Sequence, residues 1–212
     1  MSTIEVRELS VRGAAGTLRR VELYVAAGEV VAVVGDASAR ALLRTVGGVV
    51  APASGAVRSA GEELTGRSAA EVAARGVVLV PSGWTPFADL TVGENVLVGA
   101  RGDRAAAAEV LGRLPALRSD AAVASLDAAE ARTLAVAVGL ARRPRVLLVD
   151  GLAGVMGAAA ARVVLAAVRA AGVTALVAEV VAGPAARGTV EPAAYDRVLV
   201  ARGGVVRPWR PA

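Results

Sequence analysis

The stretch "VVAVVGDASARALLRTVGG", from Val30 to Gly48, decides the fold. Five apolar residues lead into a glycine, and a short polar link is followed by leucines and a valine at helical spacing. A buried strand, a turn and a helix in this order form the frame of a phosphate-binding loop. The lysine that grips phosphate in such loops is missing, and no Ser or Thr follows in its place. The stretch therefore has the outline of an anion site without its usual binding groups.

Composition limits the chemistry open to the chain. Its 212 residues suffice for one sizeable domain or one domain with an insertion. Histidine and cysteine are both absent, which excludes disulfides, zinc clusters, thiol nucleophiles and imidazole acid–base catalysis. Hydrophobic residues make up 55% of the chain but aromatic residues only 2%. We therefore expect a core built from Ala, Val and Leu.

The charge pattern favours a solvated surface. All 24 basic residues are arginines and the net charge is +5, but the arginines are scattered singly or in pairs. A nucleic-acid or anionic-membrane binder remains an alternative that rests on charge alone, and no nucleic-acid partner is expected. Glu5, Arg7 and Glu8 interrupt the start, so no signal peptide is expected. The longest uncharged runs, 45–57 and 76–88, are shorter than the roughly 20 apolar residues of a membrane span, and none is expected.

The order of apolar patterns predicts an α/β fold. The segments "TIEVRELSV" and "RRVELYV" alternate apolar and polar residues as half-buried antiparallel strands do. Continuous apolar runs at 30–34, 76–81, 145–150 and 173–179 are typical of strands covered on both faces, and helical spacing lies between them. The helices are expected at 67–75, 104–113, 127–142 and 158–171. A strand, a Gly-Gly turn and a return strand are expected in "YDRVLVARGGVVRP".

Several phrases in this frame resemble the nucleotide-binding domain of ABC-transporter ATP-binding subunits. Residues 26–57 resemble the Walker A region, and residues 61–101 resemble the Gln-loop region of the branched-chain amino-acid branch. Residues 125–151 match the signature helix and the Walker B strand without a gap. The residues that keep register there are Leu126, Glu130, Leu134, Ala135, Ala137, Leu140, Arg143, Pro144 and Asp150.

This resemblance implies a P-loop NTPase-like ABC domain over residues 1–212. It comprises a mostly parallel core sheet flanked by helices, an N-terminal antiparallel β subdomain, and a small helical subdomain at about 88–142 inserted in the core. ATP and Mg²⁺ are the implied ligands. A permease and a second, intact ATP-binding subunit are the implied partners, at the cytoplasmic face of a membrane.

The Walker A loop departs most from the family pattern. It is two residues shorter between its first glycine and the Leu-Leu pair, and it lacks the second glycine. Arg40 and Ala41 are the best stand-ins for the Lys and the Ser/Thr. One interpretation is a shrunken anion site that uses Arg40 and the helix N-terminus. The other is an ordinary strand–helix turn capped by Asp36 or Ser38. The vestigial nucleotide-binding positions are Gly35, Asp36, Ala37, Ser38, Ala39, Arg40 and Ala41.

The other family motifs are altered as well. Asp150 ends the Walker B strand and is the candidate Mg²⁺ ligand, but Gly151 stands where the family has its catalytic glutamate. Ser82 occupies the Gln-loop position, a doubtful metal ligand, and Val180 the position of the switch histidine. The signature positions are Leu126, Asp127, Ala128, Ala129 and Glu130. The adenine-stacking aromatic of the family is expected near Arg12–Ala14, where the sequence has none.

These departures predict a degenerate subunit with weak or no ATP binding and no efficient hydrolysis, acting as a partner or scaffold. The alternative is an active ATPase that energises amino-acid uptake, with Arg40 in place of the lysine. The aromatics of "PSGWTPFADL", Trp84 and Phe87, fit either a retained docking surface for the transporter or plain packing.

Overall fold

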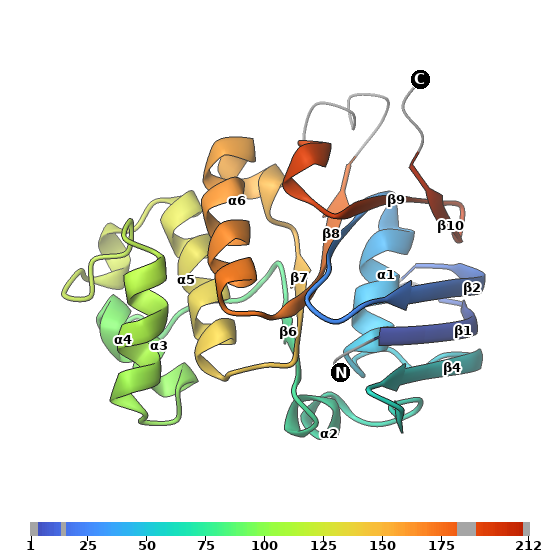
Figure 1. The fold of residues 1–212 in the computed structure, drawn as a ribbon, viewed down its shortest axis with the longest axis horizontal. Coiled ribbons are helices and arrows are strands. Elements are labelled where there is room, and N and C mark those ends of the chain that lie inside the picture. Colours follow the sequence, from blue (N-terminus) through green and yellow to red (C-terminus); the bar gives the residue numbers. More distant parts are fainter. Residues whose placement is uncertain (1–3, 14–15, 182–189, 210–212) are drawn as a thin grey trace.

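Two β-sheets with a helix between them form the framework (Figure 1). The computed structural model describes residues 4–13, 16–181 and 190–209. The larger sheet runs in the order β10 (Val205–Pro208), β9 (Arg197–Arg202), β3 (Val30–Gly35), β8 (Thr174–Val180), β7 (Val146–Asp150) and β6 (Val77–Val80). The smaller sheet runs in the order β2 (Leu18–Val25), β1 (Ile4–Val11), β4 (Ser54–Ser59) and β5 (Glu62–Glu63).

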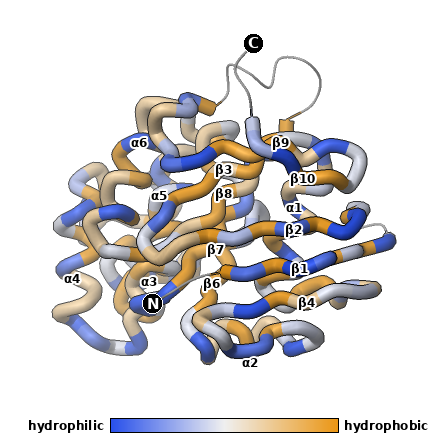
Figure 2. The backbone as a smooth tube through the Cα atoms, turned by 45° about the vertical axis from the view of Figure 1, so that its right-hand side comes forward, coloured by the Kyte–Doolittle hydropathy of each residue, from blue (hydrophilic) through white to orange (hydrophobic). Residues whose placement is uncertain are grey.

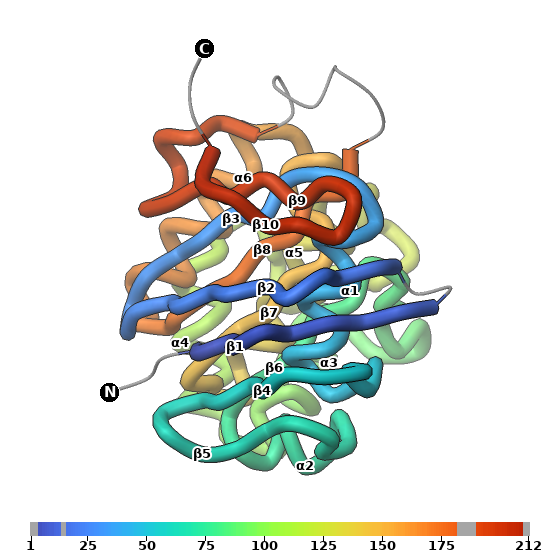
Figure 3. The backbone as a smooth tube through the Cα atoms, turned by 90° about the vertical axis from the view of Figure 1, so that its right-hand side faces the viewer, coloured from blue at the N-terminus to red at the C-terminus, as the bar shows by residue number. Residues whose placement is uncertain are grey.

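The larger sheet is parallel except for its last strand. β9, β3, β8, β7 and β6 are paired in parallel, and only β10 returns antiparallel through the Gly-Gly turn predicted from the sequence. The smaller sheet is antiparallel, and its strands lie side by side below the β9–β10 hairpin in Figure 3. The predicted α/β class, with a mostly parallel core and an N-terminal antiparallel sheet, is confirmed.

Helices cover both faces of the larger sheet. α1 (Ala37–Val46) lies between the two sheets, whereas α5 (Ala128–Ala141) and α6 (Ala153–Ala170) cover the opposite face (Figure 1). The segment between β6 and β7 holds the helices far from the smaller sheet. They are α3 (Val92–Gly99), α4 (Arg104–Arg113), the 3-10 helix η1 (Val123–Ser125) and α5. The described residues also form α2 (Ala69–Ala74) and the 3-10 helix η2 (Pro192–Ala194).

The central strands build two hydrophobic cores because their side chains alternate between the faces. Val31 and Val33 of β3 join the core that includes α1 and the smaller sheet, whereas Val30 and Ala32 join the core under α5 and α6. The strands at the centre of the larger sheet are correspondingly apolar along their length (Figure 2). Both cores consist almost entirely of Ala, Val and Leu, as the composition predicts.

The α-helix α3 was not expected from the sequence. α3 begins at a capping box in which the Thr91 side chain accepts a hydrogen bond from the Glu94 amide and the Glu94 side chain accepts one from the Thr91 amide. The signal was present in the sequence as a threonine followed three residues later by a glutamate.

By length and composition alone, α6 could cross a membrane, with a mean hydropathy of 1.5 over 18 residues. The helix nevertheless packs against α5 and β8. Two of its arginines form ion pairs at the surface, Arg162 with Glu191 and Arg169 with Asp196. We therefore interpret α6 as a core helix of this fold.

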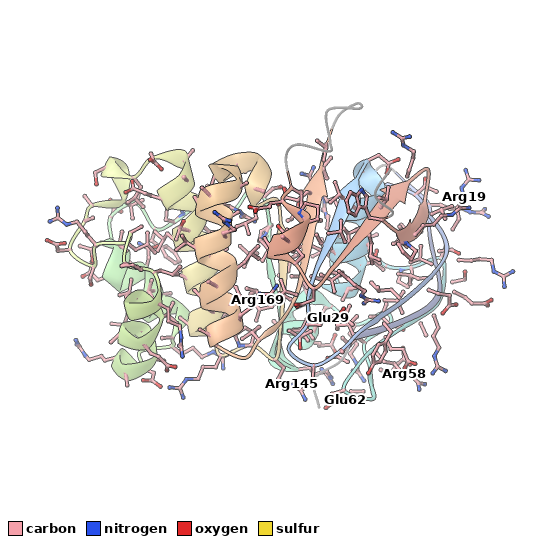
Figure 4. All side chains as sticks on the ribbon, turned by 45° about the horizontal axis from the view of Figure 1, so that its top comes forward. Arg19, Glu29, Arg58, Glu62, Arg145 and Arg169 are labelled. Carbon is pink, nitrogen blue, oxygen red and sulfur yellow. The ribbon has the colours of Figure 1, made fainter. Side chains whose placement is uncertain are left out.

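Charged side chains, Arg19 and Arg58 among them, extend outward from the ribbon in Figure 4. Most ion pairs are exposed, such as Arg145 with Glu62 and Arg58 with Glu63, and such pairs contribute little to stability. Among the ion pairs of the described residues, the most buried carboxylate is that of Asp150, which is 5% exposed and pairs with Arg40.

Candidate functional site at the carboxyl edge of the parallel sheet

The predicted motif residues meet at one edge of the larger sheet. β3, β6, β7 and β8 run parallel, so their carboxyl ends lie together, where ligand sites of open α/β sheets form. Gly35 ends β3, Asp150 ends β7, and Val180 ends β8, while Ser82 follows β6 by two residues. This edge is the candidate site.

Gly35 allows β3 to approach β9 very closely. A Cβ atom at Gly35 would lie 1.8 Å from the carbonyl oxygen of Ala201, so no other residue fits there without a shift of the backbone. The next amide, that of Asp36, donates to the same carbonyl at 3.1 Å. This hydrogen bond holds the first residue of the loop against the β9–β10 hairpin.

Asp36 caps the N-terminus of α1. In this structure the loop is therefore a turn between β3 and α1 that is capped by Asp36, the second of the two interpretations given above. One carboxylate oxygen accepts the Ser38 amide at 2.9 Å, and the other accepts the Gly203 amide at 2.7 Å. The hydroxyl of Ser38 accepts the Gly204 amide at 3.0 Å. Partial burial opposes ionisation of Asp36, but the bonds from Ser38 and Gly203 outweigh it and lower the pKa of the carboxyl group. A carboxylate of the chain itself therefore lies at the N-terminus of α1.

Arg40, one turn into α1, reaches across the site to Asp150. Its Nε donates to both carboxylate oxygens, at 2.8 and 3.0 Å, and the hydroxyl of Ser82 donates to one of them at 3.1 Å. The structure thus brings together the predicted Walker A, Gln-loop and Walker B positions. Within the described residues, no group of three or more acidic side chains gathers that could hold a metal ion.

Arg132 of α5 is a site residue that sequence reasoning missed. The side chain is buried, and it donates to the carbonyl oxygens of Val80, Pro81, Asp150 and Gly151 at 2.6–3.3 Å. It therefore holds the carboxyl ends of β6 and β7 together. Burial lowers the pKa of the guanidinium, and the nearby carboxylates of Asp150 and Glu179 oppose that change. The sequence contains a signal for this residue. Arg132 is a charged residue at helical spacing from the small residues Ala135 and Gly139, and it therefore lies on the same helix face as they do.

Glu179 of β8 is the second residue that the sequence reasoning missed. Glu179 is 2% exposed. Its carboxylate accepts hydrogen bonds from the backbone amides of Leu152, Ala153 and Gly154 at 2.7–3.3 Å. These amides begin α6, whose own N-cap residue makes no side-chain cap. Burial raises the pKa of Glu179, while the three amides and Arg132 oppose the rise. A glutamate inside the apolar run "VTALVAEV" was the available signal.

The catalytic-glutamate and switch positions carry no acid or base. Gly151 has φ +82°, a left-handed conformation in which any other residue, including a glutamate, is strained. Val180 is 41% exposed and presents a hydrocarbon side chain at the end of β8. The backbone at Gly151 thus differs from what a residue with a side chain would adopt.

The signature positions form an ordinary helix start. Asp127 and Glu130 make a capping box in which each side chain accepts the other's backbone amide, at 2.8 and 2.9 Å. Leu126 packs against the core from just outside the helix, and Ala128 and Ala129 fill its first turn. These residues bond locally, whereas Arg132 one turn later reaches the site.

The other predicted positions have structural surroundings. Ala39 and Ala41 of α1 are fully buried in the core beside the smaller sheet, and Ala37 is exposed. Trp84 is half-buried against the core under α5 and α6, whereas Phe87 is 59% exposed. The family's adenine-stacking aromatic is expected near Arg12–Ala14. Ala14, at the end of this segment, lies outside the described residues.

The fold and the order of these motifs define the class of protein. The sequence model of the ABC transporter family matches residues 18–152, more than half of the chain, and the chain belongs to this family as an ATP-binding-subunit homologue. The predicted resemblance to the ABC nucleotide-binding domain is confirmed.

Individual relatives come from several transport systems. The chain is 32% identical over 142 residues to the high-affinity branched-chain amino acid transport ATP-binding protein BraG of Pseudomonas aeruginosa, which covers 63% of this chain and 61% of that protein. It is 34% identical over 171 residues to the sulfate/thiosulfate import ATP-binding protein CysA of Bordetella pertussis, covering 74% of this chain and 48% of that protein. The chain spans less than two thirds of the length of these relatives.

Solved structures agree on the fold. The ADP conformation of an ATP-binding cassette of an ABC transporter superposes with a TM-score of 0.78 at 18% identity, covering 98% of this chain and 90% of that one. A nucleotide-free ATP-binding cassette from an ABC transporter gives 0.77 at 18% identity, covering 97% and 90%.

Proposed function

We propose that this chain is a degenerate ATP-binding-subunit homologue of an ABC transporter. It binds ATP and Mg²⁺ weakly or not at all, has no efficient hydrolysis, and acts as a partner or scaffold subunit.

The contact of Arg40 with Asp150 carries this proposal. In the family pattern the aspartate at this position supports Mg²⁺ and its water, so its oxygens must be open to the metal. Here Arg40 donates to both oxygens and Ser82 to one of them. The Arg40 guanidinium occupies the place of any cation that this carboxylate would otherwise bind. The donor set therefore does not fit a magnesium ion.

The capped N-terminus of α1 supports the same conclusion. In a phosphate-binding loop, free backbone amides at the helix start point at the phosphates. Here the Ser38 amide is bonded to Asp36, and the same carboxylate adds a negative charge where phosphate would lie. The residues at this loop do not fit a triphosphate.

Rough magnitudes agree with a lost site. A micromolar nucleotide site has about −8 kcal/mol of binding free energy. Charge-assisted hydrogen bonds contribute roughly 1.5–3 kcal/mol each, and a stack on the base roughly 1–3 kcal/mol. Without the lysine, the hydroxyl on the metal and the adenine stack, we expect affinity of about millimolar or weaker.

The partner role rests on the family. ABC sites are composite, made from the Walker A loop of one subunit and the signature of the other. This chain is altered in both motifs, so pairing with an intact subunit would affect both composite sites. We propose a scaffold bound to a permease at the cytoplasmic side of a membrane, in a system of the branched-chain amino-acid type, the type named for the BraG relative.

An ATPase assay separates this proposal from an active subunit that uses Arg40 in place of lysine. We expect purified protein with Mg²⁺ and ATP to release phosphate no faster than the matched Asp150→Ala variant. Loss of a positioned general base alone typically costs a factor of about 10²–10⁴. Turnover above background that disappears in Asp150→Ala would establish the active subunit instead.

A further inference from the structure

The first turn of α6 lies between two glycines with left-handed backbone. Gly157 has φ +79° and ψ 162°, which are not helical values, so residues 153–156 form a turn of their own ahead of 158–170. Gly151, with φ +82°, precedes this turn. A Cβ atom at either glycine would meet no atom within 4 Å, so these positions need glycine for its backbone freedom and not for space. We call residues 152–156, between the two glycines, the strap.

A buried side chain of β8 fastens the strap. Leu152 makes no side-chain cap to the helix, and its carbonyl oxygen accepts the amides of Val155 and Met156 at 3.1 Å. The Glu179 carboxylate accepts the three successive amides that begin the strap, at 2.9, 2.7 and 3.3 Å. Glu179 is buried, whereas Val155 in the strap is 49% exposed. The start of the strap is therefore held from inside the protein by a carboxylate of another element.

The strength of this fastening depends on the charge of Glu179. An ionised carboxylate accepts hydrogen bonds at both oxygens, whereas protonation turns one acceptor into an O–H donor. Hydrogen bonds to an ionised acceptor are also about twice as strong as those to a neutral one. Protonation of Glu179 therefore weakens the hydrogen bonds that hold the strap.

The surroundings of Glu179 set the acidity at which it is protonated. Burial raises the pKa of Glu179, and the strap amides and the Arg132 guanidinium of α5 oppose this rise without cancelling it. Asp150 of β7 in turn favours the charged form of Arg132. Tyr195, which follows η2, is buried, and burial and the charge of Glu179 raise the pKa of its hydroxyl, so it stays neutral in acid. Glu179 is therefore protonated at a milder acidity than an exposed glutamate.

We propose that the strap is an acid-sensitive switch, closed while Glu179 is ionised and opened by local unwinding between Gly151 and Gly157 when Glu179 is protonated. The glycines supply the backbone freedom for this change, and the rest of α6 keeps its packing against α5 and β8. The strap begins two residues after Asp150, so its opening changes the edge of the candidate site in response to acidity. The switch does not depend on whether the site binds nucleotide.

Amide hydrogen exchange, measured by mass spectrometry on peptides and corrected for the intrinsic effect of pH, tests the proposal. We expect exchange in the strap to be at least about threefold faster at about pH 5 than at about pH 7, because protonation weakens its hydrogen bonds. Exchange in residues 158–170 of the same helix should not change. Equal protection of the strap at both pH values, or equal acceleration in 158–170, overturns the proposal.

Two variants assign the effect to Glu179. Glu179→Gln keeps the side-chain length without the charge, so strap exchange should be at least about tenfold faster at about pH 7 and should no longer depend on pH. Glu191→Gln is the matched control, since it removes an exposed carboxylate that pairs with Arg162 of the same helix, and it should keep the protection and the pH dependence.

Three results with these variants overturn the proposal. They are strap exchange in Glu179→Gln like that of the unaltered protein, equal acceleration in 158–170 of that variant, and loss of the pH dependence in Glu191→Gln. If Glu179→Gln does not fold, the comparison of the unaltered protein at the two pH values decides.

Discussion

The side chain of Arg40, which we propose as the counterpart of a phosphate-binding lysine, is directed to a carboxylate of its own chain. A lysine is a compact point charge, whereas a guanidinium carries several donors in a fixed plane and pairs readily with a carboxylate. With Asp150 nearly buried, leaving that carboxylate without a cation would be unfavourable. The ion pair with Arg40 therefore stabilises the Asp150 carboxylate.

Asp36 has the corresponding role at the start of α1, and its loss should be measurable. We expect Asp36→Ala to lower the free energy of unfolding by about 0.5–2 kcal/mol at pH 7, as for other N-caps. Urea denaturation measures this change. Asp36→Asn keeps a capping oxygen and should lose less. Equal losses in both variants would contradict the capping role.

The same variant has a defined pH dependence. The folded-state pKa of Asp36 is lowered, so its charge stabilises the fold above the ordinary aspartate pKa of about 3.9. This contribution is lost as pH falls through the lower folded-state value. The difference between the protein and Asp36→Ala should therefore shrink below about pH 4. A difference that grows on acidification would contradict this assignment.

Helix α5 joins the ends of two strands through one buried arginine. We expect Arg132→Met to lower the free energy of unfolding by about 3 kcal/mol or more, because several buried carbonyl groups lose their donor. Thermal and urea unfolding measure the loss. Arg104→Met, at the exposed start of α4, is the matched control and should change stability by less than about 0.5 kcal/mol. A loss under about 1 kcal/mol for Arg132→Met would contradict the proposed role of this side chain.

The elements followed from the sequence because their local signals agree. The β3, β7 and β8 runs are mostly apolar, and the Gly-Gly turn of the final hairpin has the residues its geometry requires. α3 was missed because its capping box was not sought, although Thr91 and Glu94 carry it. Local patterns are therefore sufficient to predict most of the central strands and their helices.

The site was less predictable because its contacts join residues far apart in the chain. The sequence identified Arg40, Asp150 and Ser82 as members of one site, but it gave no sign that Arg40 would bond to Asp150 across 110 positions. For Arg132 and Glu179 the sequence shows a charge within an apolar pattern, but it does not show the groups that each charge contacts. The role of a buried charge can be predicted only when its hydrogen-bond partners are known. The partners of Arg132 and Glu179 are backbone groups of other elements.

For the molecule as a whole, the fold of an ATP-binding cassette is present, and we propose that its ligand-binding groups are replaced. The parallel sheet and the helices on both faces depend on Ala, Val and Leu packing, which the altered motif residues do not disturb. The fold and the site chemistry are therefore separable, and membership of the family does not by itself assign ATP hydrolysis.

Nucleotide binding is the most direct test of the central claim. The melting temperature of the protein should be measured with Mg²⁺ and increasing ATP, beside an intact ATP-binding cassette in the same buffer. A ligand that binds only the folded state at 100 times its Kd stabilises that state by about 2.7 kcal/mol. We predict no shift for this protein up to about 1 mM ATP, where a micromolar site would be saturated. A saturable upward shift at sub-millimolar ATP would contradict the account.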